Sequence, residues 1–245
     1  MVNQTGSSMN FSTISSTTLM YLVFSGVATG LVWICLLLAL QVGEVVKVVP
    51  VIEGSIIIDL LVGIFLFHDG VNWNKIIILI ILIAGTLMMA LKGSGRSNKS
   101  GTWLGYAIGA MVLTSVIIIL DRIGISGVNS YFERMLRYGI ALVLVWLVVF
   151  ATKGYRGLRS LSFLDGIYLC LSGAAMGGAW YCFYKGYVLG TNAIVELVER
   201  FDLVAAVVLG CVFMRERLTI RAIFGMIFMM LGFWLLLADL PIIPL

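Results

Sequence analysis

Long apolar segments constrain this 245-residue chain more than any other feature of its sequence. Eight segments are each near 20 residues long, the length that an α-helix needs to cross the hydrocarbon core of a bilayer. They lie at about residues 18–40, 45–67, 73–92, 103–124, 130–152, 163–188, 192–214 and 220–240. Hydrophobic residues make up 61% of the chain, against roughly 45–50% in soluble domains. The sequence therefore predicts an all-α integral membrane protein with about eight transmembrane helices.

Composition argues against several other classes of protein. The net charge of +4 comes from basic residues in the connections, where they orient a membrane protein, and it does not indicate nucleic-acid binding. The sequence has no Cys-x-x-Cys spacing, His/Cys cluster, Ser/His/Asp set or P-loop, so we expect no metal, no cofactor and no enzymatic activity. All the cysteines lie in apolar segments, where we expect small buried hydrophobic side chains: Cys35, Cys170, Cys182 and Cys211.

The chain repeats itself at an offset of 147 residues. The stretch "YLVFSGVATGLVWIC" at 21–35 aligns with "YLCLSGAAMGGAWYC" at 168–182, and eight of the fifteen positions are identical, Trp33 and Trp180 among them. The same offset continues without a gap to Gly85 and Gly232. The copies begin five helices apart, and an odd number of crossings reverses direction. The sequence therefore predicts an inverted-topology repeat, whose substrate site is expected near the midplane between the copies.

The two predicted repeats are unequal in length. We expect a polar, disordered tail at residues 1–16 and a first repeat of three helices at 17–92. A polar linker at 93–102 then leads into a second repeat of five helices at 103–241.

Several motifs resemble a known family. These are "SGVATGLVWICLLLALQVGEVVKVVPVIEGS" and "AGTLMMALK" in the first copy, and "TWLGYAIGAMVLTSVIIILDRIGISGVNS" and "FMRERLT" in the second. Over about residues 18–240 the chain resembles the EamA-like repeat of the drug/metabolite transporter superfamily. The resemblance implies paired five-helix repeats whose third and fourth helices line the pathway. The sequence departs from it in three ways: the first copy matches only three helices, Arg215 replaces the usual Gly, and the first-copy turn "HDGVN" barely matches.

Four ionisable residues interrupt the seventh apolar segment, in the stretch "ELVERFD". They are Glu196, Glu199, Arg200 and Asp202. A charge at mid-bilayer costs at least about 2.5–3.5 kcal/mol, so such groups face a bundle interior or a water-filled cavity. One interpretation is a cavity in which Glu199, Asp202 or Glu196 binds a coupling proton. The other is a structural network near the interface.

The repeat offset also predicts a pair of charges. Glu53 of the first copy corresponds to Arg200 of the second, so the two become neighbours if the copies face each other across a pseudo-two-fold axis. Together with the acid and base that the resemblance implies at Glu199 and Arg200, this gives a candidate substrate-binding set. Its members are Glu53, Glu199, Arg200, Trp33, Trp180 and Tyr184. For the tryptophans, packing of helix against helix is the alternative interpretation.

The remaining polar residues receive simpler interpretations. We expect solvated helix ends at Asp121, Arg122, Arg134 and Arg137. We expect Lys47 to snorkel to the membrane surface, Asp59 to face inward and His68 to be exposed.

The leading functional hypothesis is a secondary transporter or exporter of small metabolites or drugs in the cell membrane. The alternative is a non-transporting scaffold or assembly partner derived from a transporter. The expected partners are a small-molecule substrate, the bilayer, and either a second copy or another subunit that covers the flank left by two missing helices. Basic residues favour termini outside the cell, whereas the resemblance implies termini inside, and both orientations stay open.

Overall fold

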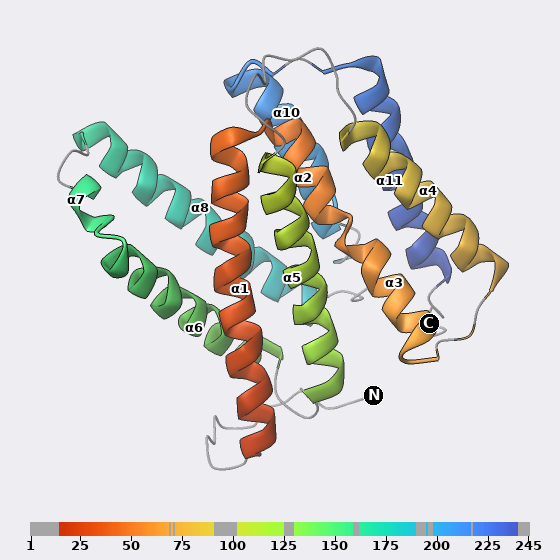
Figure 1. Cartoon of the computed structure of the whole chain (residues 1–245), viewed down its shortest axis with the longest axis horizontal. Helices are drawn as coiled ribbons and strands as arrows, with labels where there is room; N and C mark the ends of the chain where they lie inside the picture. Colours follow the sequence, from red (N-terminus) through yellow and green to blue (C-terminus); the bar gives the residue numbers. More distant parts are fainter. Residues whose placement is uncertain are drawn as a thin grey trace.

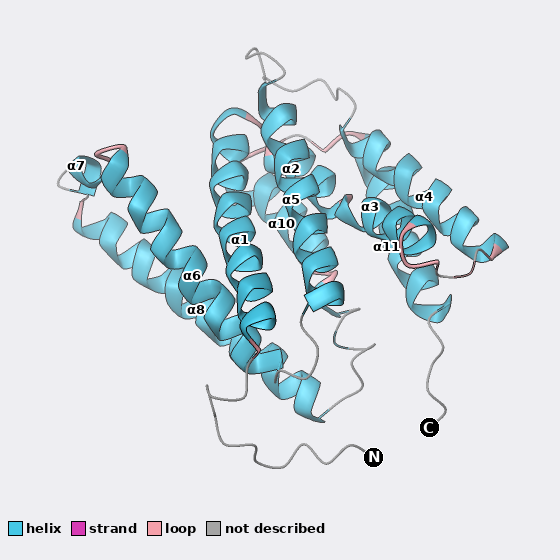
Figure 2. Ribbon diagram, turned by 60° about the horizontal axis from the view of Figure 1, so that its bottom comes forward, coloured by secondary structure: helices cyan, strands magenta, loops and turns pink. Residues whose placement is uncertain are grey.

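A computed structural model describes residues 15–68, 70, 72–90, 102–124, 130–158, 162–189, 195, 198–216 and 218–239. These residues form helices and connections and contain no strand (Figures 1 and 2). The helices are α1 (Ser16–Val42), α2 (Val45–Glu53), α3 (Ser55–Phe65), α4 (Trp73–Ala90), α5 (Thr102–Gly124), α6 (Ser130–Ala151), α7 (Tyr155–Leu158), α8 (Phe163–Leu189), α10 (Asp202–Phe213) and α11 (Ile220–Asp239).

The all-α membrane fold is confirmed. Within the described residues, six helical segments are long and apolar enough to cross a membrane. They are Ser16–Val42, Val45–Phe65, Trp73–Ala90, Thr102–Gly124, Glu133–Ala151 and Ile220–Ala238. Helix α8 has the length of a span but is not among the six, and α10 covers only 12 residues. The count of eight spans and the layout of three plus five helices stay predictions.

The segment predicted as one helix at 45–67 forms one spanning segment, Val45–Phe65, with a one-residue interruption that divides it into the half-helices α2 and α3. Helix α2 ends at Glu53 and α3 begins at Ser55, with Gly54 between them at φ −61° and ψ −7°. The second copy breaks at the same place, because α10 begins at Asp202 after Phe201, which has φ −70° and ψ −10°. Gly54 and Phe201 are 147 positions apart, and so are Ser55 and Asp202, where the following helices begin. The two interruptions therefore fall at equivalent positions of the repeat predicted from the sequence.

The turns that follow the two half-helices also share a backbone conformation. His68 and Arg215, again 147 residues apart, lie in the left-handed region at φ 54° and 55°. Side chains other than glycine are disfavoured there because Cβ crowds the following carbonyl oxygen. This explains why the resembling family usually has Gly at the position of Arg215. It also shows that the turn around His68 matches in conformation although its sequence barely matches.

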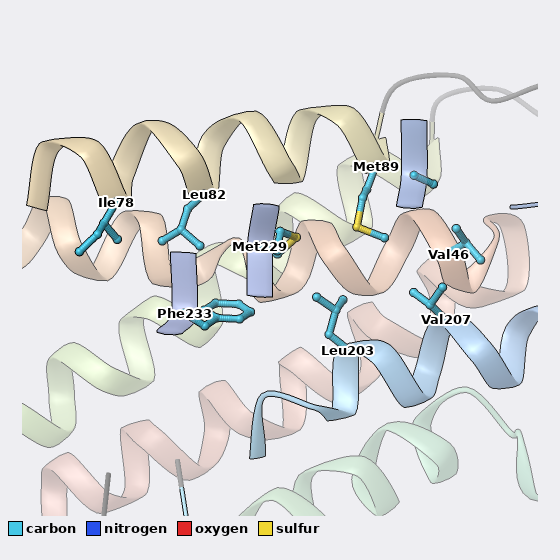
Figure 3. Packing of buried hydrophobic residues seen from close by; sticks show 9 residues of the cluster. Val46, Ile78, Leu82, Met89, Leu203, Val207, Met229 and Phe233 are labelled. Carbon is cyan, nitrogen blue, oxygen red and sulfur yellow. The ribbon is translucent and has the colours of Figure 1, made fainter. Parts of the chain in front are cut away.

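The largest buried cluster joins the last helices of the two copies, α4 and α11, to α2 and α10 (Figure 3). Its buried members are Val46, Ile78, Leu82, Met89, Leu203, Val207, Ala222, Met229 and Phe233. Repeat-equivalent glycines face this contact from both sides. A Cβ on Gly85 would lie 2.8 Å from Met229 Cγ, and one on Gly232 would lie 2.6 Å from Leu82 Cδ2. The glycines therefore allow α4 and α11 to approach closely.

Helix α1 packs on α5 and α6, whereas the equivalent helix α8 has few contacts. A Cβ on Gly26 would lie 2.7 Å from Ile140 Cβ of α6, and one on Gly30 would lie 2.7 Å from Leu144 Cδ2. The equivalent glycines of α8, Gly173 and Gly177, have nothing within 4 Å. Figure 1 shows α6, α7 and α8 projecting to one side of the remaining helices.

Of two further expectations about the chain, one needs correction. Residues 1–14 lie outside the described residues, but Ser15 caps α1 by accepting a hydrogen bond from the Thr17 backbone N–H, and Ser16 begins the helix. The predicted tail at 1–16 stays a prediction. The cysteines are free but are not buried: Cys170 and Cys182 are exposed on α8, and the other two are half-buried. An outward-facing position on a membrane helix meets lipid, which an apolar thiol tolerates as well as a protein interior.

Gly85→Leu should lower the thermal stability of the detergent-purified protein, because the added side chain collides with the α11 backbone and Met229. Overpacking of this kind costs about 1–3 kcal/mol. Gly105→Leu on α5 is the matched control, since a Cβ there meets open space. Equal melting temperatures for the two variants would contradict the close α4–α11 contact.

Arg215→Gly and His68→Gly should each stabilise the protein by about 0.5–1 kcal/mol, because glycine adopts the left-handed region without crowding. Met214→Gly, at φ −91°, should instead destabilise it, since glycine there only adds freedom to the unfolded chain. Thermal unfolding of the three variants checks these signs. A loss of stability in both Arg215→Gly and His68→Gly would contradict the shared turn conformation.

Candidate functional site

The predicted pair of charges meets at the two helix breaks. Arg200 Nη1 donates a hydrogen bond to Glu53 Oε2 at 2.9 Å, which confirms the neighbourhood that the repeat offset predicts. Glu53 is the last residue of α2, and Arg200 directly precedes the residue that caps α10. The Glu53 side chain is 19% exposed and that of Arg200 is 34% exposed. One face of the pair is therefore accessible while the other is enclosed by the two copies.

Three further carboxylates surround this pair. Glu199 and Asp202 act electrostatically on Glu53, and Arg200 acts on Asp59 of α3. The Oδ1 atom of Asp59 is buried without a hydrogen-bond partner among the described residues, as expected for a side chain that faces inward. Arg122 also acts on Asp59, so the four carboxylates and two guanidinium groups give a formal charge of −2. A charge of this size inside a membrane protein has to be compensated by protons, by water or by a bound cation.

The guanidinium of Arg200 packs against a residue of the buried cluster. The guanidinium carbon Cζ lies 5.3 Å from the centroid of the Phe233 ring, within the range of a cation–π interaction. Phe233 belongs to α11 and is only 3% exposed, so its ring is a fixed surface. The last helix of the second copy therefore helps to fix the position of the basic partner.

Glu216 fixes the opposite end of α2. Its two carboxylate oxygens accept hydrogen bonds from the backbone N–H groups of Val45 at 2.8 Å and Val46 at 2.9 Å. These are the first N–H groups of α2, which have no partner within the helix, and the carboxylate also complements the positive end of the helix dipole. The turn "FMRERLT" of the second copy thus anchors the half-helix that carries Glu53 in the first.

A column of aromatic rings lies between helices of the two copies. The rings of Trp33 and Tyr138 stack with centroids 5.6 Å apart and planes 13° apart. Tyr138 also contacts Trp180, with centroids 4.9 Å apart and planes tilted by 58°. The guanidinium of Arg134 lies 5.8 Å from the Trp180 ring centroid. The repeat-equivalent tryptophans therefore converge on one tyrosine of α6.

A second ionic network corrects the expectation of solvated helix ends. Arg137 of α6 pairs with Asp121 of α5 at 2.6 Å and also with Glu133. Ser25 of α1 donates a hydrogen bond to Asp121 at 3.3 Å. The Arg137 side chain is only 11% exposed, and its Nε atom is buried without a partner among the described residues. The sequence interpretation was wrong for Asp121 and Arg137 because helix-end charges are solvated only where no neighbouring helix covers them.

The remaining polar and aromatic residues singled out in the sequence differ in their surroundings and in whether the structure describes them. Lys47 is 9% exposed and pairs with Glu44 at 2.7 Å, so it does not extend to the surface as predicted. His68 is exposed, as predicted. Arg122 lies over the Phe67 ring at 5.0 Å. The side chain of Tyr184 and the whole of Glu196 lie outside the described residues.

Sequence reasoning missed two residues of this centre, Tyr138 and Glu216. Tyr138 follows Arg137 directly, but nothing in the sequence indicates that α6 passes between the two tryptophan-bearing helices. Glu216 lies inside the motif "FMRERLT", and a carboxylate in a short turn before a helix is a recognisable capping signal. Its actual target, the start of α2, is 171 residues away and could not be found from local pattern.

Comparison with known proteins identifies the family. Residues 101–238 match the EamA-like transporter family, which is more than half of the chain. The chain belongs to the EamA-like transporter family. A protein of Sinorhizobium sp. named "Uncharacterized transporter in cobO 3'region" is 24% identical over 137 residues, which are 56% of this chain and 97% of the relative. No solved structure matches the chain.

Membership places the chain among the membrane transporters of the drug/metabolite superfamily and points away from an enzyme. Among the described residues, no group of three or more His, Cys, Asp or Glu side chains could hold a metal ion.

Glu53→Gln and Arg200→Gln should each destabilise the protein by about 1–3 kcal/mol, because each leaves one member of the pair without its charged partner. The double variant should cost less than the sum of the two single variants. Chemical or thermal unfolding in detergent measures this coupling. Strictly additive losses would show that the two side chains do not interact in the membrane-embedded protein.

Proposed function

We propose that this EamA-like chain is a secondary transporter or exporter of small metabolites or drugs that works by alternating access between two inverted repeats. The observation that carries the proposal is the Glu53–Arg200 pair at 2.9 Å, formed by repeat-equivalent residues at the breaks of two half-helices. In transporters with inverted repeats, such discontinuous helices form the substrate site near the bilayer midplane.

The charged pair supplies binding groups of both signs. The guanidinium of Arg200 suits a carboxylate or phosphate, while Glu53 and Glu199 suit an amine. In this proposal the substrate contacts Glu53, Glu199, Arg200, Trp33, Trp180 and Tyr184.

Proton coupling is part of the proposal. The excess of carboxylates over guanidinium groups around Arg200 makes binding of a proton favourable, because neutralising a carboxylate lowers the cost of holding it in the membrane. Glu199, Asp202 and Glu196 are the proposed carriers. The proton would bind when substrate leaves and be released when substrate enters, which links the two movements.

A specific observation favours the second candidate function, a scaffold or assembly partner. The glycine face of α8 is open at Gly173 and Gly177, whereas the equivalent face of α1 is covered by α6. A second copy or another subunit would cover α8 if it takes the place that α6 takes on α1. A transporter can also assemble in this way. A measurement of transport, and not of assembly, therefore separates the two functions.

Reconstitution into proteoliposomes tests the proposal. Uptake and efflux should be measured across a panel of amino acids, nucleobases and drugs, with and without a proton gradient. Glu53→Gln and Arg200→Ala should each reduce the transport rate by at least tenfold. The exchange Glu53→Arg with Arg200→Glu should restore part of it, because the pair is re-formed with reversed charges.

Asp165→Asn is the matched control, since Asp165 is an exposed carboxylate at the start of α8, away from the helix break. Its transport should stay within about twofold of the wild type, because a charge at an exposed position contributes little. No transport of any compound by a folded wild-type protein would favour the scaffold. Unchanged transport in Glu53→Gln and Arg200→Ala would remove the pair from the site.

A further inference from the structure

Two contacts between the copies define where the pseudo-two-fold axis passes. Glu53 and Arg200 are repeat equivalents that touch each other, so the axis runs between them. Trp33 and Trp180 are also repeat equivalents, and both touch the ring of Tyr138. Tyr138 therefore lies near the same axis, and the space that its ring fills beside the two indoles is called the slot below.

The slot adjoins the charged site. Tyr138 interacts electrostatically with Glu199, the neighbour of Arg200, and with Arg134 and Arg137 on its own helix. Asp121 of α5 also faces it. A molecule bound at Glu53 and Arg200 would thus have the aromatic slot beside it and not at a separate place in the protein.

The geometry of the slot suits one kind of group. Aromatic rings pair at centroid distances of about 4.5–7 Å, either stacked or tilted, and Tyr138 makes a stacked contact with Trp33 and a tilted one with Trp180. One indole comes from each copy at an equivalent position. The slot would therefore present the same aromatic surface to a substrate in both states of alternating access. The Tyr138 ring is the element that fills the slot in this structure.

We propose that the slot beside Trp33 and Trp180 is a subsite for a planar aromatic or heteroaromatic ring of the substrate, and that the Tyr138 ring occupies this subsite when no substrate is bound. This inference rests on the proposed transport function and adds the chemical class of the substrate. Substrate entry then requires Tyr138 to leave the slot, so the tyrosine selects for rings that stack at least as well as its own. The competing interpretation is that the three rings only hold α1, α6 and α8 together.

Equilibrium binding to the purified full chain in lipid nanodiscs separates the two interpretations. The probes are benzamide and its saturated counterpart cyclohexanecarboxamide, which match in charge and hydrogen-bonding groups and differ in planarity. Binding is measured by saturation-transfer NMR. Tyr138→Ala empties the slot, whereas Tyr138→Phe keeps a ring in it.

Tyr138→Ala should bind benzamide roughly two- to tenfold more tightly than Tyr138→Phe, as expected for one recovered stacking contact. Cyclohexanecarboxamide should show no such difference. Adding Trp33→Ala or Trp180→Ala to the Tyr138→Ala background should remove the gain. Adding Trp146→Ala should leave it intact, because Trp146 stacks on Phe150 at the far end of α6.

Equal benzamide binding by Tyr138→Ala and Tyr138→Phe would overturn the proposal, as would an equal gain for the saturated amide. If Tyr138→Ala does not fold, Tyr138→Leu replaces it, since leucine preserves packing without a flat ring. Binding is measured without a gradient, so its outcome is independent of transport. Ring-selective binding without transport would refute the proposed function and leave the subsite, whereas transport without ring selectivity would refute only the subsite.

Discussion

The ion pair between Glu53 and Arg200 is the contact on which the centre of this protein depends. It joins the two copies at the points where their half-helices break, so each copy provides one charge and one break. Neither charge is tolerable alone at this depth, because an unpaired ion inside a membrane protein costs several kcal/mol. The pair therefore favours the arrangement in which the equivalent segments of the two copies face each other.

Other parts of the structure hold the two partners in place. Glu216 of the second copy binds the first N–H groups of α2, and Phe233 of α11 supports the guanidinium of Arg200. The α4–α11 contact brings Phe233 within reach because Gly85 and Gly232 leave no side chain between the helices. Because the chain belongs to the EamA-like transporter family, these contacts lie at the centre of a membrane transporter.

Sequence patterns predicted the membrane fold and one central contact, for physical reasons. Apolar segments of spanning length have few alternatives to membrane helices, and the 147-residue offset led to one real contact, between Glu53 and Arg200. The break at Gly54 was missed because α2 and α3 together read as one apolar run. Tyr138 and the Asp121–Arg137 pair were missed because they depend on how α6 crosses its neighbours, which hydropathy does not encode.

Inverted topology is the central claim, and the accessibility of two turns tests it most directly. His68 and Arg215 are equivalent, exposed and alike in backbone conformation, yet inversion places them on opposite faces of the membrane. Each is replaced by cysteine in a chain whose own four cysteines are removed. An impermeant maleimide applied to sealed vesicles of one orientation should label only one of the two variants, and permeabilised vesicles should label both. Labelling of both variants in sealed vesicles would place the turns on the same face and contradict the account.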